Sequence, residues 1–173
     1  DLRELAKQNP DDIRGKSYTF WNYDGTEVHK FEASYSNCFG MNYRVEEVYF
    51  NRAEAYLNNN QKDLALADLS KVYKERIAPT GDATLKAENV EEATDILRRE
   101  KRIEFCFEDI RWFDIRRWGL AVEHAYPDLH DSQSVRTFVL EAESPNYVLS
   151  LPLDVQRINP DMKRPERVET IVK

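Results

Sequence analysis

The segment from Ile96 to Gly119 carries the side chains best suited to chemistry, because it is dense in both carboxylates and arginines. Paired carboxylates act as general acid and base when their surroundings drive their pKa values apart. The candidates for such a role, which would make the protein a hydrolase, are Glu104, Glu108 and Asp114. Their neighbours are mostly arginines, which hold carboxylates ionised. The pattern therefore favours a structural ion-pair network, and the hydrolase alternative requires these carboxylates to be exposed in a cleft.

The same segment is expected to form one long helix, or two helices in series. Ile96, Ile103 and Phe107 recur at helical spacing, and Glu100 falls between the first two, on or beside the buried face. Charges three residues apart can pair along one helix side. The pairs with this spacing are Glu108 with Arg111, Arg111 with Asp114, and Asp114 with Arg117. A buried carboxylate is costly unless it is paired, so ion pairs are expected here.

A β-hairpin is predicted between Lys16 and Glu32, with its turn at the Asp-Gly pair 24–25. Aromatic rings fall on both faces of this hairpin, and one face places Trp21 beside Tyr23. Aromatic rings stack on sugars, and Asn22 adds a polar group. We therefore interpret Trp21, Asn22 and Tyr23 as candidate ligand-binding residues. The alternative is that neighbouring structure covers both faces.

Two amphipathic helices follow a polar loop. The apolar stripe predicted for the first comprises Val45, Val48, Tyr49, Ala53, Tyr56 and Leu57, and the stripe of the second comprises Ala65, Leu69, Val72 and Tyr73. Their spacing resembles one tetratricopeptide repeat, with small Ala53 and Ala65 where the helices approach. A single repeat cannot bury its own face, so neighbouring helices are expected outside this chain.

The rest of the chain gives weaker signals. Asn89 is a plausible N-cap, residues 120–125 are expected to continue briefly as helix, and residues 135–140 to form a strand. The residues that would be considered for a metal site are His124, Asp128, His130 and Asp131. Their spacing matches no standard ligand set, and surface histidines near acids are common. Cys38 and Cys106 belong to no metal or redox pattern. Neither a metal nor a cofactor is predicted.

Composition describes a globular chain of 173 residues, with 41% hydrophobic and 33% charged residues. This length predicts one domain, residues 1–173. A net charge of -7 argues against nucleic acid as a partner. No apolar run is long enough to span a bilayer. The chain starts at Asp1 without a signal sequence, so it is expected to be part of a larger protein.

The central segment carries a long motif made of Glu100, Arg102, Glu104, Phe107, Glu108, Arg111, Trp112, Asp114, Arg117, Trp118 and Gly119. In order and spacing these residues resemble the central signature of the SusD/RagB family, which comprises outer-membrane nutrient-binding lipoproteins of Bacteroidetes. The segment from Arg44 to Tyr56 and the closing run with Pro152, Asn159, Pro160, Met162 and Pro165 extend the resemblance. The departures from the family pattern are Lys101 for arginine, Cys106 for a small residue, Asp109 for glycine, Ser150 for proline and Arg164 for asparagine.

The resemblance implies a mainly α fold of SusD type, with irregular loops, a small β-hairpin and one tetratricopeptide-like helix pair. The chain would be the C-terminal part of the whole protein. That protein would be non-enzymatic, anchored at the cell surface by a lipid outside this chain, and would pass an oligosaccharide or a peptide to a SusC-like TonB-dependent transporter. The alternative function is a tetratricopeptide-type scaffold for protein interactions, and the carboxylate-dependent hydrolase is a further one.

Overall fold

The computed structural model describes residues 2–17, 43–106, 108–127, 135–159, 161–163 and 165–172. Two compact units account for the chain, Asp1–Ile110 and Arg111–Lys173, and each is considered by itself. The described residues are mainly helical with a small antiparallel sheet, as the sequence predicts. Residues 18–32 of the predicted hairpin, with Trp21, Asn22 and Tyr23, lie outside the described residues, as does Cys38. The first two residues of that prediction, Lys16 and Ser17, instead end a short helix, Arg14–Ser17.

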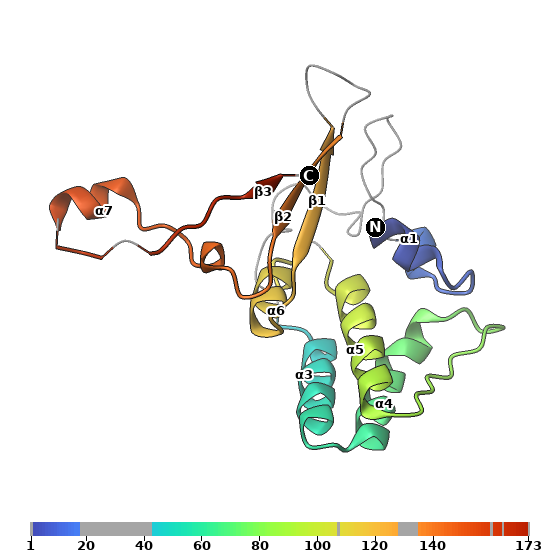
Figure 1. Cartoon of the computed structure of the whole chain (residues 1–173). Coiled ribbons are helices and arrows are strands. Elements are labelled where there is room, and N and C mark those ends of the chain that lie inside the picture. Colours follow the sequence, from blue (N-terminus) through green and yellow to red (C-terminus); the bar gives the residue numbers. More distant parts are fainter. Residues whose placement is uncertain are drawn as a thin grey trace. The chain divides into compact units, whose positions relative to one another are not determined.

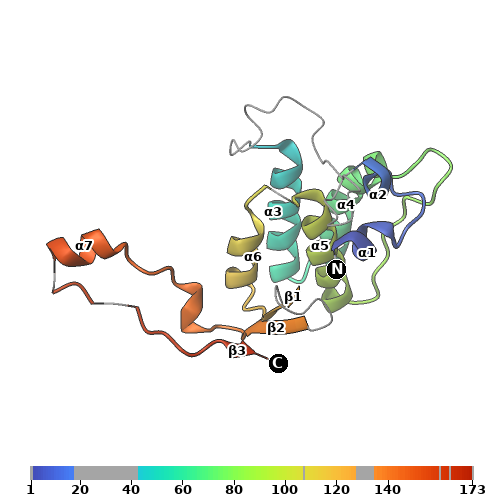
Figure 2. The same cartoon turned by 90° about the horizontal axis from the view of Figure 1, so that it is seen from above.

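The first unit is built from helices (Figure 1). Their bounds are α1 Leu2–Lys7, α2 Arg14–Ser17, α3 Val45–Asn58, α4 Lys62–Tyr73, the 3₁₀ turn η1 Lys74–Arg76 and α5 Val90–Glu104. Helices α3 and α4 lie side by side, and α5 packs against both (Figure 2). No described helix has the length and apolarity needed to cross a membrane.

The tetratricopeptide-like pair is confirmed as α3 and α4. Ala53 and Ala65 are both 0% exposed, so small side chains do lie where these helices approach. The apolar stripe predicted for the first helix is wrong in part, because Val45 and Val48 are 69% and 64% exposed. Phe50 takes their place in the core at 1% exposed. The helix carries apolar residues on more than one side, so spacing alone does not identify the side that meets α4 and α5.

Helix α5 begins at the predicted cap. The Asn89 side chain accepts a hydrogen bond from the backbone N–H of Glu92 at 2.9 Å, and the Glu92 carboxylate accepts one from the N–H of Glu88 at 2.8 Å. This satisfies amide groups that a helix start would leave without partners. Helix α5 ends at Glu104, so the central segment forms helices in series. Asp109 follows with a φ of 58°, in the left-handed region.

The second unit combines short helices with a sheet (Figure 1). Its elements are α6 Arg111–Arg117, β1 Val122–Pro127, β2 Val135–Leu140, the 3₁₀ turn η2 Pro145–Tyr147, α7 Leu153–Ile158 and β3 Ile171–Val172. The strand order is β1-β2-β3, and both pairings are antiparallel.

Strand β2 confirms the predicted strand at residues 135–140, whereas the helix predicted for residues 120–125 is wrong. Gly119 adopts a φ of 60°, which ends α6. The chain then pairs with β2 from Val122 to Pro127. Cross-strand pairing therefore overrides a weak local helical preference. Tyr147 supports this turn, because its hydroxyl donates to the carbonyl of Leu120 at 2.6 Å.

Candidate functional site

A buried cluster of charges occupies the interior of the first unit. Arg14 is 1% exposed and donates from Nε and Nη2 to the carboxylate of Asp12 at 3.0 and 2.7 Å. The same guanidinium reaches Glu100 at 2.5 Å and Glu104 at 3.3 Å. A delocalised, planar guanidinium suits this task because its donors fan out to several carboxylates. Burial lowers the pKa of Arg14, but the bonds and charges of Asp12 and Glu100 outweigh burial and raise it.

Glu104 is the fully buried acid of this cluster, at 0% exposed. Arg76 donates to it from Nη2 at 2.9 Å and from Nε at 3.1 Å, and Arg44 donates at 2.9 Å. Burial would raise the pKa of Glu104, but the hydrogen bonds of Arg76 and the charges of Arg76, Arg14 and Arg44 outweigh it and lower the pKa to about 2. Glu104 is therefore held as an anion.

The N-terminal segment positions Arg14. Asn9 accepts from the backbone N–H of Asp11 at 3.0 Å, which forms a turn. The chain then runs beside the segment after η1, where the N–H of Ala78 donates to the carbonyl of Asp11 at 2.8 Å and Asp12 forms a bridge with Ile77. Backbone pairing thus places Arg14 against Glu100 and Glu104 of α5.

The hydrolase alternative required Glu104, Glu108 and Asp114 to be exposed in a cleft. Glu104 is buried among arginines, and Asp114 is 4% exposed and bonded to Arg117 at 2.9 Å. Glu108 lies 3.4 Å from Arg44. Glu104 and Asp114 are thus buried beside arginines, and Glu108, with its side chain 14% exposed, also lies beside one, as in a structural network. The sequence predicted the Asp114–Arg117 pair correctly.

Sequence reasoning missed Arg14, Arg44 and Arg76 as partners of the α5 carboxylates. A signal was present, because Glu100 and Glu104 are four residues apart and share one helix face with buried Ile103 nearby. Two carboxylates on a buried face demand cations from elsewhere in the fold. Nothing in the spacing identifies which arginines supply them.

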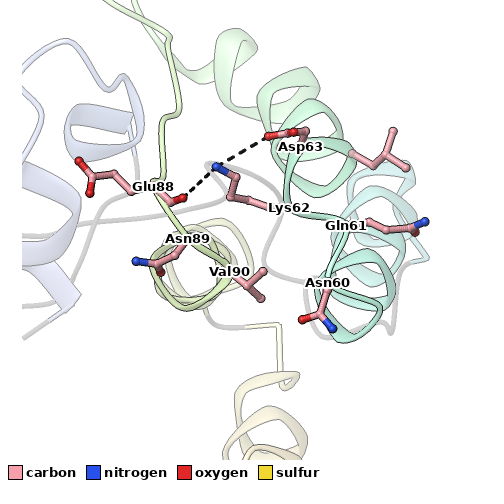
Figure 3. Close-up of a pocket in the computed structure, with 8 residues that line it drawn as sticks. Asn60, Gln61, Lys62, Asp63, Glu88, Asn89 and Val90 are labelled. Carbon is pink, nitrogen blue, oxygen red and sulfur yellow. Dashed lines mark hydrogen bonds and ion pairs between the residues drawn. The ribbon is translucent and has the colours of Figure 1, made fainter.

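An open depression of about 480 Å³ lies between the turn that joins α3 to α4 and the start of α5 (Figure 3). Its lining residues are Asn60, Gln61, Lys62, Asp63, Leu64, Glu88, Asn89 and Val90. Lys62 spans it, donating to the carbonyls of Ala87 at 2.8 Å and Glu88 at 3.1 Å. Amide and carboxylate groups can bond to hydroxyl groups of a ligand, but the lining holds no aromatic ring. From the sequence, this turn was predicted only as the end of a helix.

The residues considered for a metal site are not brought together among the described parts of the chain. His124 lies exposed on β1, and Asp128, His130 and Asp131 lie outside the described residues. Within the described ranges, no group of three or more histidine, cysteine, aspartate or glutamate side chains is placed to hold a metal ion. Cys106 is buried at 6% exposed.

A tetratricopeptide-like helix pair braced by buried ion pairs defines a helical scaffold of the kind that binding proteins use. Comparison with known proteins gives the family: the model of the SusD family matches residues 8–148, and the chain belongs to the SusD family. This is a nutrient-binding family, generally non-enzymatic.

A solved structure shows the same fold. The crystal structure of a SusD-like protein from Bacteroides fragilis NCTC 9343 aligns with a TM-score of 0.52 and 22% identity, over 82% of this chain and 30% of that chain. The present chain therefore spans about 30% of the length of that SusD-like protein. No curated protein matches the chain significantly.

Proposed function

We propose that this chain is the C-terminal part of a lipid-anchored protein on the outer membrane surface that binds a nutrient and passes it to a SusC-like TonB-dependent transporter. The match of residues 8–148 to the SusD family carries this proposal. The bound nutrient is an oligosaccharide, with a peptide as the second candidate. The protein does not convert its ligand, which agrees with the arginine-bound state of Glu104 and Asp114.

We place part of the binding site on Trp21, Asn22 and Tyr23. Two rings at alternate positions of a strand would give a sugar a stacking surface, and the amide would supply hydrogen bonds. The depression around Lys62 is a second candidate, since its volume of about 480 Å³ and the amide and carboxylate side chains in its lining suit a small saccharide.

The test is a binding screen of the full-length protein against oligosaccharides and peptides, with Trp21→Ala and Tyr23→Ala beside the wild type. We expect either substitution to lower the affinity for the ligand roughly tenfold, because a stacking ring contributes about 1 kcal/mol or more to binding. A Gln61→Ala variant, which changes the depression near Lys62, is the matched control. Binding unchanged by Trp21→Ala and Tyr23→Ala but lost with Gln61→Ala would move the site to the depression. A protein that binds no nutrient would contradict the proposal.

The tetratricopeptide-like pair suggests where the transporter docks. Tyr43, Val45 and Val48 are 93%, 69% and 64% exposed at the start of α3. Apolar side chains gathered on one exposed segment mark a surface that another protein covers. The same observation supports the alternative function, a scaffold for protein interactions. The two functions differ in the nutrient screen, because a scaffold alone would bind no oligosaccharide.

A further inference from the structure

The segment between η2 and β3 of the second unit is a loop whose two ends are bonded together. The Asn146 side chain donates to the carbonyl of Val168 at 2.8 Å and accepts from the N–H of Val168 at 3.2 Å. Arg167 donates to the hydroxyl of Ser150 at 2.6 Å. We call residues 148–166, which include α7, the α7 loop (Figure 1). Its ends are fixed by bonds that do not involve α7.

Helix α7 lacks the interactions that usually stabilise a short helix. It has six residues, and isolated helices shorter than about 12 residues are marginal in water. Its N-cap residue, Pro152, supplies no side-chain hydrogen bond, and none of the six residues is buried. Most of the stability of a helix in a protein comes from packing of its apolar side chains. A stable α7 therefore requires a further surface to pack against.

The side chains that such a surface would cover are apolar. Those with exposed fractions of 74%, 66%, 39% and 85% are Leu149, Leu153, Val155 and Ile158. Val155 and Ile158 are three residues apart, so they share one side of α7. The charges of α7 are engaged with each other, because Arg157 donates to Asp154 at 3.3 Å. The covering surface is therefore expected to be apolar, and burial of apolar area to provide the attraction.

The length of the whole protein favours one occupant for this surface. The chain spans about 30% of the length of the SusD-like protein described above, so the proposed function places most of the polypeptide outside the chain. A surface on the same polypeptide meets the α7 loop at an effective concentration of about millimolar, far above that of a separate protein. Because the ends of the loop are already fixed, docking also costs less conformational entropy.

We propose that the α7 loop packs the side of α7 with Val155 and Ile158, together with Leu149, against an apolar surface in the part of the full-length protein outside this chain. Residues that are exposed here are then part of a core that two separate regions of the polypeptide share. This inference rests on the proposed function only in taking the chain as part of a longer protein, and it adds the contact that joins the parts.

The experiment measures the rate at which a maleimide reagent labels cysteine variants of the full-length protein, without nutrient or transporter. Ile158→Cys and Arg157→Cys are a matched pair, because Ile158 is 85% exposed and the Arg157 side chain 78% exposed in this structure. We expect Ile158→Cys to react at least about tenfold more slowly, since a buried thiol is inert, and the difference to vanish in urea. Leu149→Cys should also react slowly. Mass spectrometry of each labelled peptide excludes the signal of Cys38 and Cys106.

A photoreactive benzophenone maleimide on Arg157→Cys, beside the covered side, identifies the occupant. Its cross-links should reach peptides outside the 173 residues of this chain. Cross-links confined to the chain itself, or equal labelling of Ile158→Cys and Arg157→Cys, would overturn the inference. Protection of Ile158→Cys that is lost on about tenfold dilution would overturn it in favour of a second copy. No nutrient enters these measurements, so a protein that protects Ile158→Cys but binds no nutrient contradicts the proposed function alone.

Discussion

At the scale of single residues, Glu104 is central because it joins three segments of the first unit through Arg14, Arg44 and Arg76. Replacing Glu104 with alanine would leave Arg14 buried with one acid fewer. We expect Glu104→Ala to lower the free energy of unfolding by about 3 kcal/mol or more, since removing one member of a buried charge cluster is strongly destabilising. Urea denaturation measures this. The control is Glu75→Ala, whose side chain is 65% exposed and should matter by less than about 0.5 kcal/mol. Equal midpoints for both variants would show that the cluster contributes nothing.

The lowered pKa of Glu104 predicts an acid-sensitive fold. Its pKa falls from 4.5 to about 2 on folding, so between these values the unfolded chain binds the proton more readily than the folded one. The contribution of Glu104 is thus fully present above about pH 4.5 and is lost as the pH falls toward 2, by roughly 3 kcal/mol. Urea denaturation of wild type and Glu104→Gln over this range should show a steeper loss in the wild type. Parallel curves would contradict the prediction.

Asp109 offers a prediction in the stabilising direction. Its φ of 58° lies in the left-handed region, where a residue other than glycine is strained by about 1 kcal/mol. The family signature that this chain resembles has glycine there. We expect Asp109→Gly to raise stability by about 0.5 kcal/mol, less than the full strain because glycine makes the unfolded chain more flexible. Differential scanning calorimetry measures the change. The control is Asp95→Gly within α5, which should lower stability; a lower melting temperature for Asp109→Gly would argue against strain at this position.

At the scale of elements, the N-terminal segment depends on close contact with the segment after η1. A Cβ added at Gly81 would lie 2.6 Å from Cβ of Asp11 and 2.7 Å from Cγ2 of Ile77. Gly81→Ala should therefore push these two segments apart and lower stability by about 1–3 kcal/mol, as overpacking does. Thermal unfolding measures the cost. Ala83→Gly in the same loop is the comparison variant. A neutral Gly81→Ala would mean that Asp11 moves without cost.

The exposed start of α3 should matter for assembly and not for folding. Val45→Asp combined with Val48→Asp changes side chains that are 69% and 64% exposed, so stability should shift by no more than about 0.5 kcal/mol per substitution. If the transporter covers this surface, the two introduced carboxylates would be buried in the interface. They should then reduce the amount of transporter that co-purifies with the full-length protein. Leu64→Asp on α4, 48% exposed, is the control. Undiminished co-purification would place the transporter contact elsewhere.

These elements also show how far sequence alone reaches. The helix pair, the Asn89 cap and strand β2 follow from local spacing and were predicted correctly. The exposed side of α3 and the strand at residues 122–127 were not predicted correctly, because each depends on which distant segment packs or pairs there. Arg14 was missed for the same reason, since its partners on α5, Glu100 and Glu104, lie 86 and 90 residues away. Trp21, Asn22 and Tyr23 remain a prediction.

At the scale of the whole molecule, the chain combines a core that contains buried ion pairs with a proposed role in nutrient binding. Buried Glu104 and Asp114 pair with arginines that are partly exposed, and these pairs hold the two acids in structural roles. The chain spans about 30% of the SusD-like protein that it resembles, so ligand contacts from the rest of a whole protein are expected to complete the site. Binding is therefore best measured on the full-length protein.

The most direct measurement is isothermal titration of the full-length protein with oligosaccharides, followed by chromatography of the recovered ligand. The account predicts saturable binding and recovery of the ligand at its original length, because a nutrient-binding protein captures its ligand without converting it. Cleavage of the ligand, or the absence of binding to any oligosaccharide or peptide, would contradict the central claim.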